Sequence, residues 1–139
     1  MIQLFLRLFG TICLLVGLLH IVLGLGADDL LGAGLDAVTL LNASLDSQNR
    51  FYGAAFMLFG GVAWMCADDP IRYKSLLRLA MFIFFIGGLA RIVSAAMIGM
   101  PVLTIQILGL TELVMPPLVL LWHQRWLRTQ ISRAQEENP

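Results

Sequence analysis

LLRLAMFIFFIGGLARIVSAAMI, residues 76–98, is apolar over its whole length except for Arg78, Arg91 and Ser94. A helix rises about 1.5 Å per residue, so this stretch is long enough to cross a hydrocarbon core of about 30 Å. Apolar stretches of this length are typical of transmembrane helices. The stretch therefore predicts a membrane-spanning helix, and it decides the fold class.

Three further apolar stretches lie at residues 4–25, 50–67 and 102–126. Only 13% of the residues are charged, against about 25% in soluble domains, so the chain could not cover a soluble surface. The net charge is zero, which argues against nucleic-acid binding. We predict an all-α, integral membrane four-helix bundle. Residues 1–128 would form the four-span domain, and residues 129–139 a polar tail that frays.

The first stretch is also compatible with a cleaved signal peptide. A basic residue, Arg7, precedes the apolar run, and small residues around Gly24 follow it. However, the apolar run at residues 8–25 is longer than the usual core of about 7–15 residues in a signal peptide. We therefore expect this stretch to be retained as the first span.

Basic residues indicate the orientation, because they collect on the cytoplasmic side of membrane proteins. In a four-span chain, seven of the nine basic residues fall on one side. They are Arg7, Arg72, Lys74, Arg78, Arg125, Arg128 and Arg133. The opposite side holds Asp28, Asp29, Asp36 and Asp46. Both termini, and with them the polar tail, should therefore be cytoplasmic.

Residues 26–48 form the outer connection between the first two spans. Glycines predict an irregular first half. The second half repeats apolar residues at helical spacing: Leu35, Val38, Leu41 and Leu45. We expect a periplasmic loop or a short amphipathic helix here, and a helix cap for the second span from Asp46 or Ser47.

Two charges lie far inside the apolar stretches, Arg91 in the third and Glu112 in the fourth. A charge at mid-membrane costs about 2.5–3.5 kcal/mol on insertion scales, so it usually faces a partner or a wet cavity and marks function. We predict that the two residues form an ion pair. The pair either fixes the register of the helices alone or also binds a ligand or handles a proton, and the sequence leaves both open.

Depth along the spans puts His20, Arg50, Arg91 and Glu112 in one layer. Each has small residues one turn away, and small residues in membrane helices mark close approach of backbones. The four side chains should therefore point into the bundle. His20 by itself is more typical of a hydrogen bond between helices than of a ligand.

Motifs for catalysis and cofactor binding are missing from the sequence. Cys13 and Cys66 form no Cys-x-x-Cys pair and are typical of small packing residues. His20 and His123 should lie at opposite ends of the membrane, so no metal spacing exists. We find no Ser-His-Asp set, no glycine loop for phosphate and no histidine pair for haem. We predict no catalytic residue, no metal and no cofactor, and we favour a non-catalytic role over an enzyme.

Several short motifs together resemble a known family. They are GLLH at 17–20, NRFY at 49–52, GGLARIVS at 87–94, GMP at 99–101 and EL at 112–113. Over residues 4–126 the chain is similar to the bacterial small membrane proteins called domain of unknown function 4345, and more distantly to DoxX-like four-helix membrane proteins. The resemblance implies a multi-pass protein of the bacterial inner membrane and implies no established reaction.

The predicted polar-layer or ligand-binding residues are His20, Asn49, Arg50, Tyr52, Arg91, Ser94 and Glu112. Arg91 and Arg50 would hold an anionic or carbonyl group, with Glu112 orienting Arg91 and His20 adding a hydrogen bond. Our leading hypothesis is a non-catalytic membrane protein that binds a small amphiphile or a protein partner in the outer half of the bundle. The alternatives are an accessory or assembly subunit of a larger membrane complex, and a proton-coupled transporter or membrane enzyme.

Overall fold

The computed structural model describes residues 1–137, in which six helices and no strand occur. Four helices are long and apolar enough to cross a membrane. They are α1 (Ile2–Leu23), α4 (Ala43–Asp68), α5 (Lys74–Ile98) and α6 (Leu103–Glu137). Two short helices, α2 (Leu25–Leu30) and α3 (Ala37–Leu40), lie between α1 and α4. The predicted all-α bundle with four membrane-spanning helices is confirmed.

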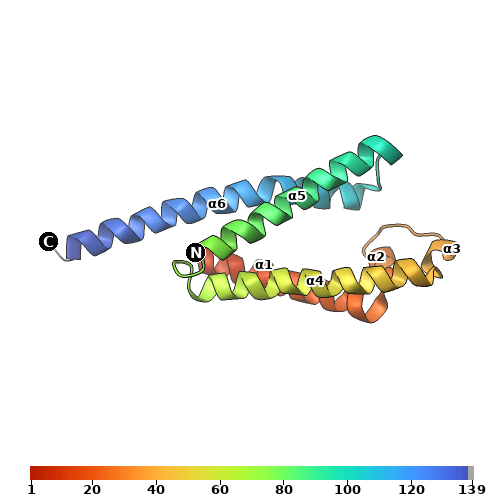
Figure 1. Ribbon diagram of the computed structural model, residues 1–139, viewed down its shortest axis with the longest axis horizontal. Coiled ribbons are helices and arrows are strands. Elements are labelled where there is room, and N and C mark those ends of the chain that lie inside the picture. The colour runs from red at the N-terminus through yellow and green to blue at the C-terminus, as the bar shows by residue number, and fades with distance from the viewer. Residues whose placement is uncertain (138–139) are drawn as a thin grey trace.

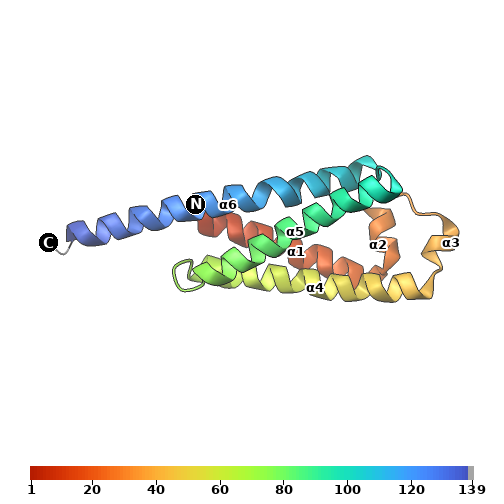
Figure 2. The same cartoon turned by 45° about the horizontal axis from the view of Figure 1, so that its top comes forward.

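The four long helices form two antiparallel pairs. Helix α1 packs mainly against α4, and α5 packs mainly against α6 (Figure 1). The N-terminus and the turn between α4 and α5 lie at one end of the bundle, whereas α2 and α3 lie at the other (Figure 2). The molecule is therefore two helical hairpins laid against each other, and we call the end with α2 and α3 the outer end.

Two sets of glycines fix the α1–α4 pair at backbone contact. Gly10 and Gly17 are seven residues apart on α1, and Gly53 and Gly60 are seven residues apart on α4. A Cβ atom added to Gly17 would lie 2.5 Å from the carbonyl oxygen of Gly53, and one added to Gly60 would lie 2.7 Å from that of Gly10. Only glycine fits at these positions, so the spacing of seven on both helices sets their register.

The contact between the two hairpins gathers in the half of the bundle that holds the N-terminus. Its buried side chains include Ile2 and Leu6 of α1, Leu77 and Met81 of α5, and Val119 of α6. The ring of Phe84 on α5 also meets Phe9, Phe56 and Phe59, at centroid distances of 5.7, 6.5 and 5.8 Å. Apolar packing therefore joins the two hairpins in this half of the bundle.

The outer connection differs from the prediction. Helix α4 begins at Ala43, seven residues before the expected start, because the Asn42 side chain accepts hydrogen bonds from the backbone N–H groups of Ser44 and Leu45, both at 3.1 Å. The predicted cap from Asp46 or Ser47 is therefore wrong. The first half, expected to be irregular, contains α2, and the expected amphipathic helix is reduced to the single turn of α3.

The C-terminal segment also differs from the prediction. Helix α6 runs through Pro116 and Pro117 and continues to Glu137, so the part of the tail that the structure describes is helical. Figure 1 shows α6 extending beyond the bundle. His123 is fully buried where α6 leaves the core, and its Nε2–H donates to the carbonyl oxygen of Pro70 at 2.9 Å. This contact ties α6 to the α4–α5 turn.

Candidate functional site

Arg91 of α5 and Glu112 of α6 form the ion pair that the sequence predicts. The Arg91 Nε–H donates to Glu112 Oε2 at 2.7 Å, and Nη2–H donates to Oε1 at 2.9 Å. Two parallel bonds of this kind hold the guanidinium and the carboxylate in one plane. The Glu112 side chain is 12% exposed and that of Arg91 is 40% exposed, so the carboxylate is largely enclosed and Arg91 is the more accessible partner.

Each partner of the pair lies against a glycine of the opposite helix. Gly109 stands three residues before Glu112, and a Cβ atom there would be 3.3 Å from Arg91 Cδ. Gly88 stands three residues before Arg91, and a Cβ atom there would be 3.1 Å from Glu112 Cβ. The two glycines let α5 and α6 approach closely enough for the pair to form. The sequence already contained this signal, since both helices carry a glycine three residues before the charge.

The guanidinium of Arg91 keeps unused donor capacity. Arginine has five N–H groups, and Arg91 places two of them on Glu112. Within residues 1–137 no other hydrogen bond from Arg91 is formed, so three N–H groups, two on Nη1 and one on Nη2, have no protein partner. In hydrocarbon an unsatisfied polar group costs several kcal/mol. These groups therefore favour a bound acceptor or water.

A crevice of about 420 Å³ opens between α5 and α6 beneath the turn that joins them, with Arg91 in its wall. Its other walls are mostly apolar and include Ile92, Leu110 and Leu113. Gln106 also lines it, and its Nε2–H donates to the carbonyl oxygen of Pro101 at 2.8 Å. The crevice thus combines one charged donor, one amide and an apolar lining, which is typical of sites for small molecules.

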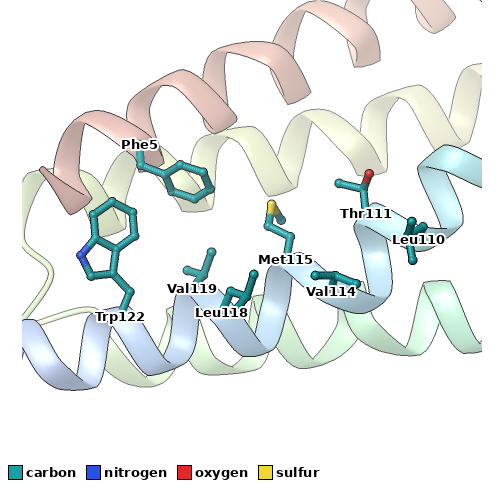
Figure 3. Close-up of a pocket in the computed structure, with 8 residues that line it drawn as sticks. All are labelled: Phe5, Leu110, Thr111, Val114, Met115, Leu118, Val119 and Trp122. Atoms are coloured by element: carbon teal, nitrogen blue, oxygen red, sulfur yellow. The ribbon is translucent and has the colours of Figure 1, made fainter.

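A second cavity of about 410 Å³, which we call the groove, runs along α6 and is almost wholly apolar. Figure 3 shows Phe5 of α1 facing a row of α6 side chains that reaches from Leu110 to Trp122. Thr111 is its only lining residue with a side-chain hydroxyl. Leu110 lines both cavities, so the crevice and this groove share a wall. The groove was not predicted, because surface side chains of one long apolar helix give no sequence signal for it.

Arg50 lies in a separate polar cluster at the outer ends of α1 and α4. Its Nε–H donates to Asp46 Oδ2 at 2.7 Å, and Nη1–H groups donate to the carbonyl oxygens of Ile21 at 2.6 Å and Val22 at 3.0 Å. Asp46 Oδ1 also accepts the backbone N–H of Leu25 at 3.1 Å. Arg50 therefore holds the C-terminal end of α1 against α4, and Asp46 is its main hydrogen-bonding partner.

His20 and Asn49 belong to the same outer cluster and meet on Asp28 of α2. The His20 Nδ1–H donates to the carbonyl oxygen of Val16 at 2.7 Å, and Nε2 lies 3.2 Å from Asp28 Oδ1. The Asn49 side-chain amide donates to the other oxygen of Asp28. Asp28 thus holds α2 against α1 and α4. His20 acts here as a hydrogen-bonding residue between helices.

The single polar layer expected from the sequence is divided into these two clusters. In the described chain no hydrogen bond or ion pair joins Arg50 or His20 to Arg91 or Glu112, and no residue of α1 or α4 lines the Arg91 crevice. Tyr52 is exposed, with its hydroxyl 3.4 Å from Gln48 Oε1. Ser94 is exposed on α5. Neither residue joins a cluster.

Asp28 and Asp46 were missed as partners of the predicted residues. Asp46 could have been found from its position four residues before Arg50 on one helix face. Asp28 lies in the connection between α1 and α4, and the sequence does not predict how far residues of a connection reach into the bundle. Cys13 and Cys66 are buried free thiols, and the described residues contain no group of three or more His, Cys, Asp and Glu side chains placed to hold a metal ion.

Comparison with known families adds the identity of the chain. A family model described as Domain of unknown function (DUF4345) matches residues 1–123. The chain belongs to this family. The match covers α1, α4 and α5 in full and α6 as far as His123, together with both polar clusters. Searches of curated proteins and of solved structures gave no match. The similarity to DoxX-like proteins stays a prediction.

Proposed function

We propose that this DUF4345 protein is a non-catalytic binding protein of the bacterial inner membrane, and that the crevice beside Arg91 takes up a small amphiphile. Arg91 binds the polar head, and Glu112 orients Arg91 from the enclosed side. The observation that carries the proposal is the guanidinium itself. Three of its N–H groups have no acceptor from the described protein, and the Arg91 side chain lines a crevice of about 420 Å³.

The groove along α6 supports an amphiphile over a purely polar ligand. It is apolar, and it shares Leu110 with the crevice. From Leu110 to Trp122 the helix rises about 18 Å, which suits an extended hydrocarbon chain. A molecule with its head at Arg91 and its chain along α6 would satisfy the donors and cover the apolar wall together.

The distribution of basic residues supports cytoplasmic termini and a crevice that opens toward the periplasm. Arg7 of α1 pairs with Asp68 at the end of α4 at 3.1 Å, and Arg72 lies in the turn that follows. These residues mark the end of the bundle opposite the crevice. Basic residues favour the cytoplasmic side, so the crevice would lie on the other side of the membrane.

Native mass spectrometry from mild detergent tests the proposal with a matched pair of variants. Ala95 lines the crevice, whereas its exposed neighbour Ala96 does not. We expect the unmodified protein and Ala96→Phe to carry the same small molecule, and Ala95→Phe to lose it because the ring fills the crevice. Arg91→Ala should also lose it.

Equal retention by both phenylalanine variants, or an empty protein in all cases, would contradict the proposal. Matching circular dichroism spectra and melting temperatures for Ala95→Phe and Ala96→Phe would show that both variants fold. A second protein chain recovered in stoichiometric amount, with no small molecule, would favour the alternative of an accessory subunit.

A further inference from the structure

We infer that the head of the bound amphiphile is uncharged and offers carbonyl oxygens, as in an acylglycerol ester. This inference rests on the proposed function and adds the chemical class of the ligand. It follows from the charges and hydrogen-bonding groups that line the crevice.

The charge of the site argues against an ionic head. Arg91 is the only charged side chain among the residues that line the crevice, and Glu112 already balances it through two hydrogen bonds. An anionic head would leave a net negative charge among apolar walls, which is costly. A cationic head would be repelled by the guanidinium, and the carboxylate of Glu112 does not line the crevice.

The hydrogen-bonding groups argue for a head that accepts more than it donates. Arg91 offers three free N–H groups, and Gln106 offers one, because the other N–H of its amide donates to Pro101. The side-chain oxygen of Gln106, which accepts no bond within the described chain, is the one acceptor set against these four donors. The oxygens of Glu112 each accept a bond from Arg91. Pro116 and Pro117 have no backbone N–H, so the backbone carbonyls four residues earlier, at Glu112 and Leu113, lack their usual helical donors. These carbonyls do not add acceptors to the crevice, because helix carbonyls point toward the C-terminus and the crevice lies near the N-terminal end of α6. Two ester carbonyls match such a site.

Three probes with the same chain length test this class: dioctanoylglycerol, its diether analogue without carbonyls, and dioctanoyl phosphatidic acid. Each is titrated into the full-length protein in mild detergent, and binding is read by native mass spectrometry. We expect dioctanoylglycerol to bind at least about tenfold more tightly than the diether, because hydrogen bonds from a charged donor to the carbonyls are lost in the diether. It should also bind more tightly than the phosphatidic acid.

The tenfold preference should vanish in Ala95→Phe and persist in Ala96→Phe. Equal binding of diester and diether that Ala95→Phe still abolishes would overturn the ligand class and leave the amphiphile site standing. Tighter binding of phosphatidic acid would overturn it in favour of an anionic head. Binding of all three probes unchanged by Ala95→Phe, or no binding at all, would overturn the proposed function as well.

Discussion

The ion pair between Arg91 and Glu112 should contribute a measurable coupling energy to folding. Its two charge-assisted hydrogen bonds, at 2.7 and 2.9 Å, are each worth about 1.5–3 kcal/mol when a charged group is involved. Arg91 is 40% exposed, which lowers the value, and a glutamine at 112 keeps one acceptor oxygen. We therefore expect Glu112→Gln to lower the free energy of unfolding by about 2 kcal/mol.

A double-mutant cycle isolates this interaction. The free energy of unfolding is measured for the unmodified protein, Glu112→Gln, Arg91→Gln and the double variant by titration with sodium dodecyl sulfate in mixed micelles. The coupling energy should be about 2 kcal/mol, because the double variant loses both charges together and leaves none unpaired.

The exposed pair of Arg7 and Asp68 provides the control for this cycle. Its atoms are 3.1 Å apart, and its side chains are 50% and 64% exposed. Exposed pairs are typically worth at most about 1 kcal/mol, so the Arg7–Asp68 cycle should give a clearly smaller coupling energy. A coupling at Arg91 no larger than that of the control would refute the argument that the largely enclosed carboxylate of Glu112 and the guanidinium of Arg91 form a strong pair.

Two further predictions use matched variants. Gly17→Ala places a methyl group 2.5 Å from a backbone oxygen of α4 and should lower the free energy of unfolding by about 1–3 kcal/mol. The control variant Gly61→Ala meets nothing within 4 Å and should not lower it. The same micelle titration measures both variants, and equal effects would argue against a register set by the glycines. Val114→Trp narrows the groove along α6 and should shorten the longest fatty chain that co-purifies with the protein, as measured by lipid mass spectrometry. The control variant Leu121→Trp changes an exposed position outside the groove and should leave the length of that chain unchanged.

Much of the bundle follows from sequence because the bilayer imposes simple demands. A span must be long and apolar, and a charge within it needs a partner. The meeting of Arg91 and Glu112 could be predicted from these two demands. The start of α4 and the end of α6 could not be predicted in this way, because both helices continue past the apolar region. Asn42 supplies a strong cap outside it, and the polar residues after Trp126 do not stop the helix.

The partner of Arg50 could not be predicted from depth alone. Depth placed Arg50 near Arg91, but Asp46 lies one turn away on the same helix and reaches Arg50 at 2.7 Å without any constraint from the packing of other helices. The carbonyls at the end of α1 then take the remaining donors. A nearby local partner therefore competes well with a distant one, and depth in the membrane cannot separate them.

The contrast between Arg50 and Arg91 is the strongest argument for a binding role at Arg91. Arg50 makes four hydrogen bonds to acceptors of the protein, two to Asp46 and two to carbonyls of α1, which is the pattern of a structural arginine. Arg91 makes two, both to Glu112, and its side chain lines a crevice. If Arg91 served only to fix the register of α5 and α6, its three remaining donors would depend on water alone, because a donor without an acceptor in hydrocarbon works against folding. An acceptor supplied from outside the chain removes that cost, and its binding energy would then depend on the same pair that holds the two helices together.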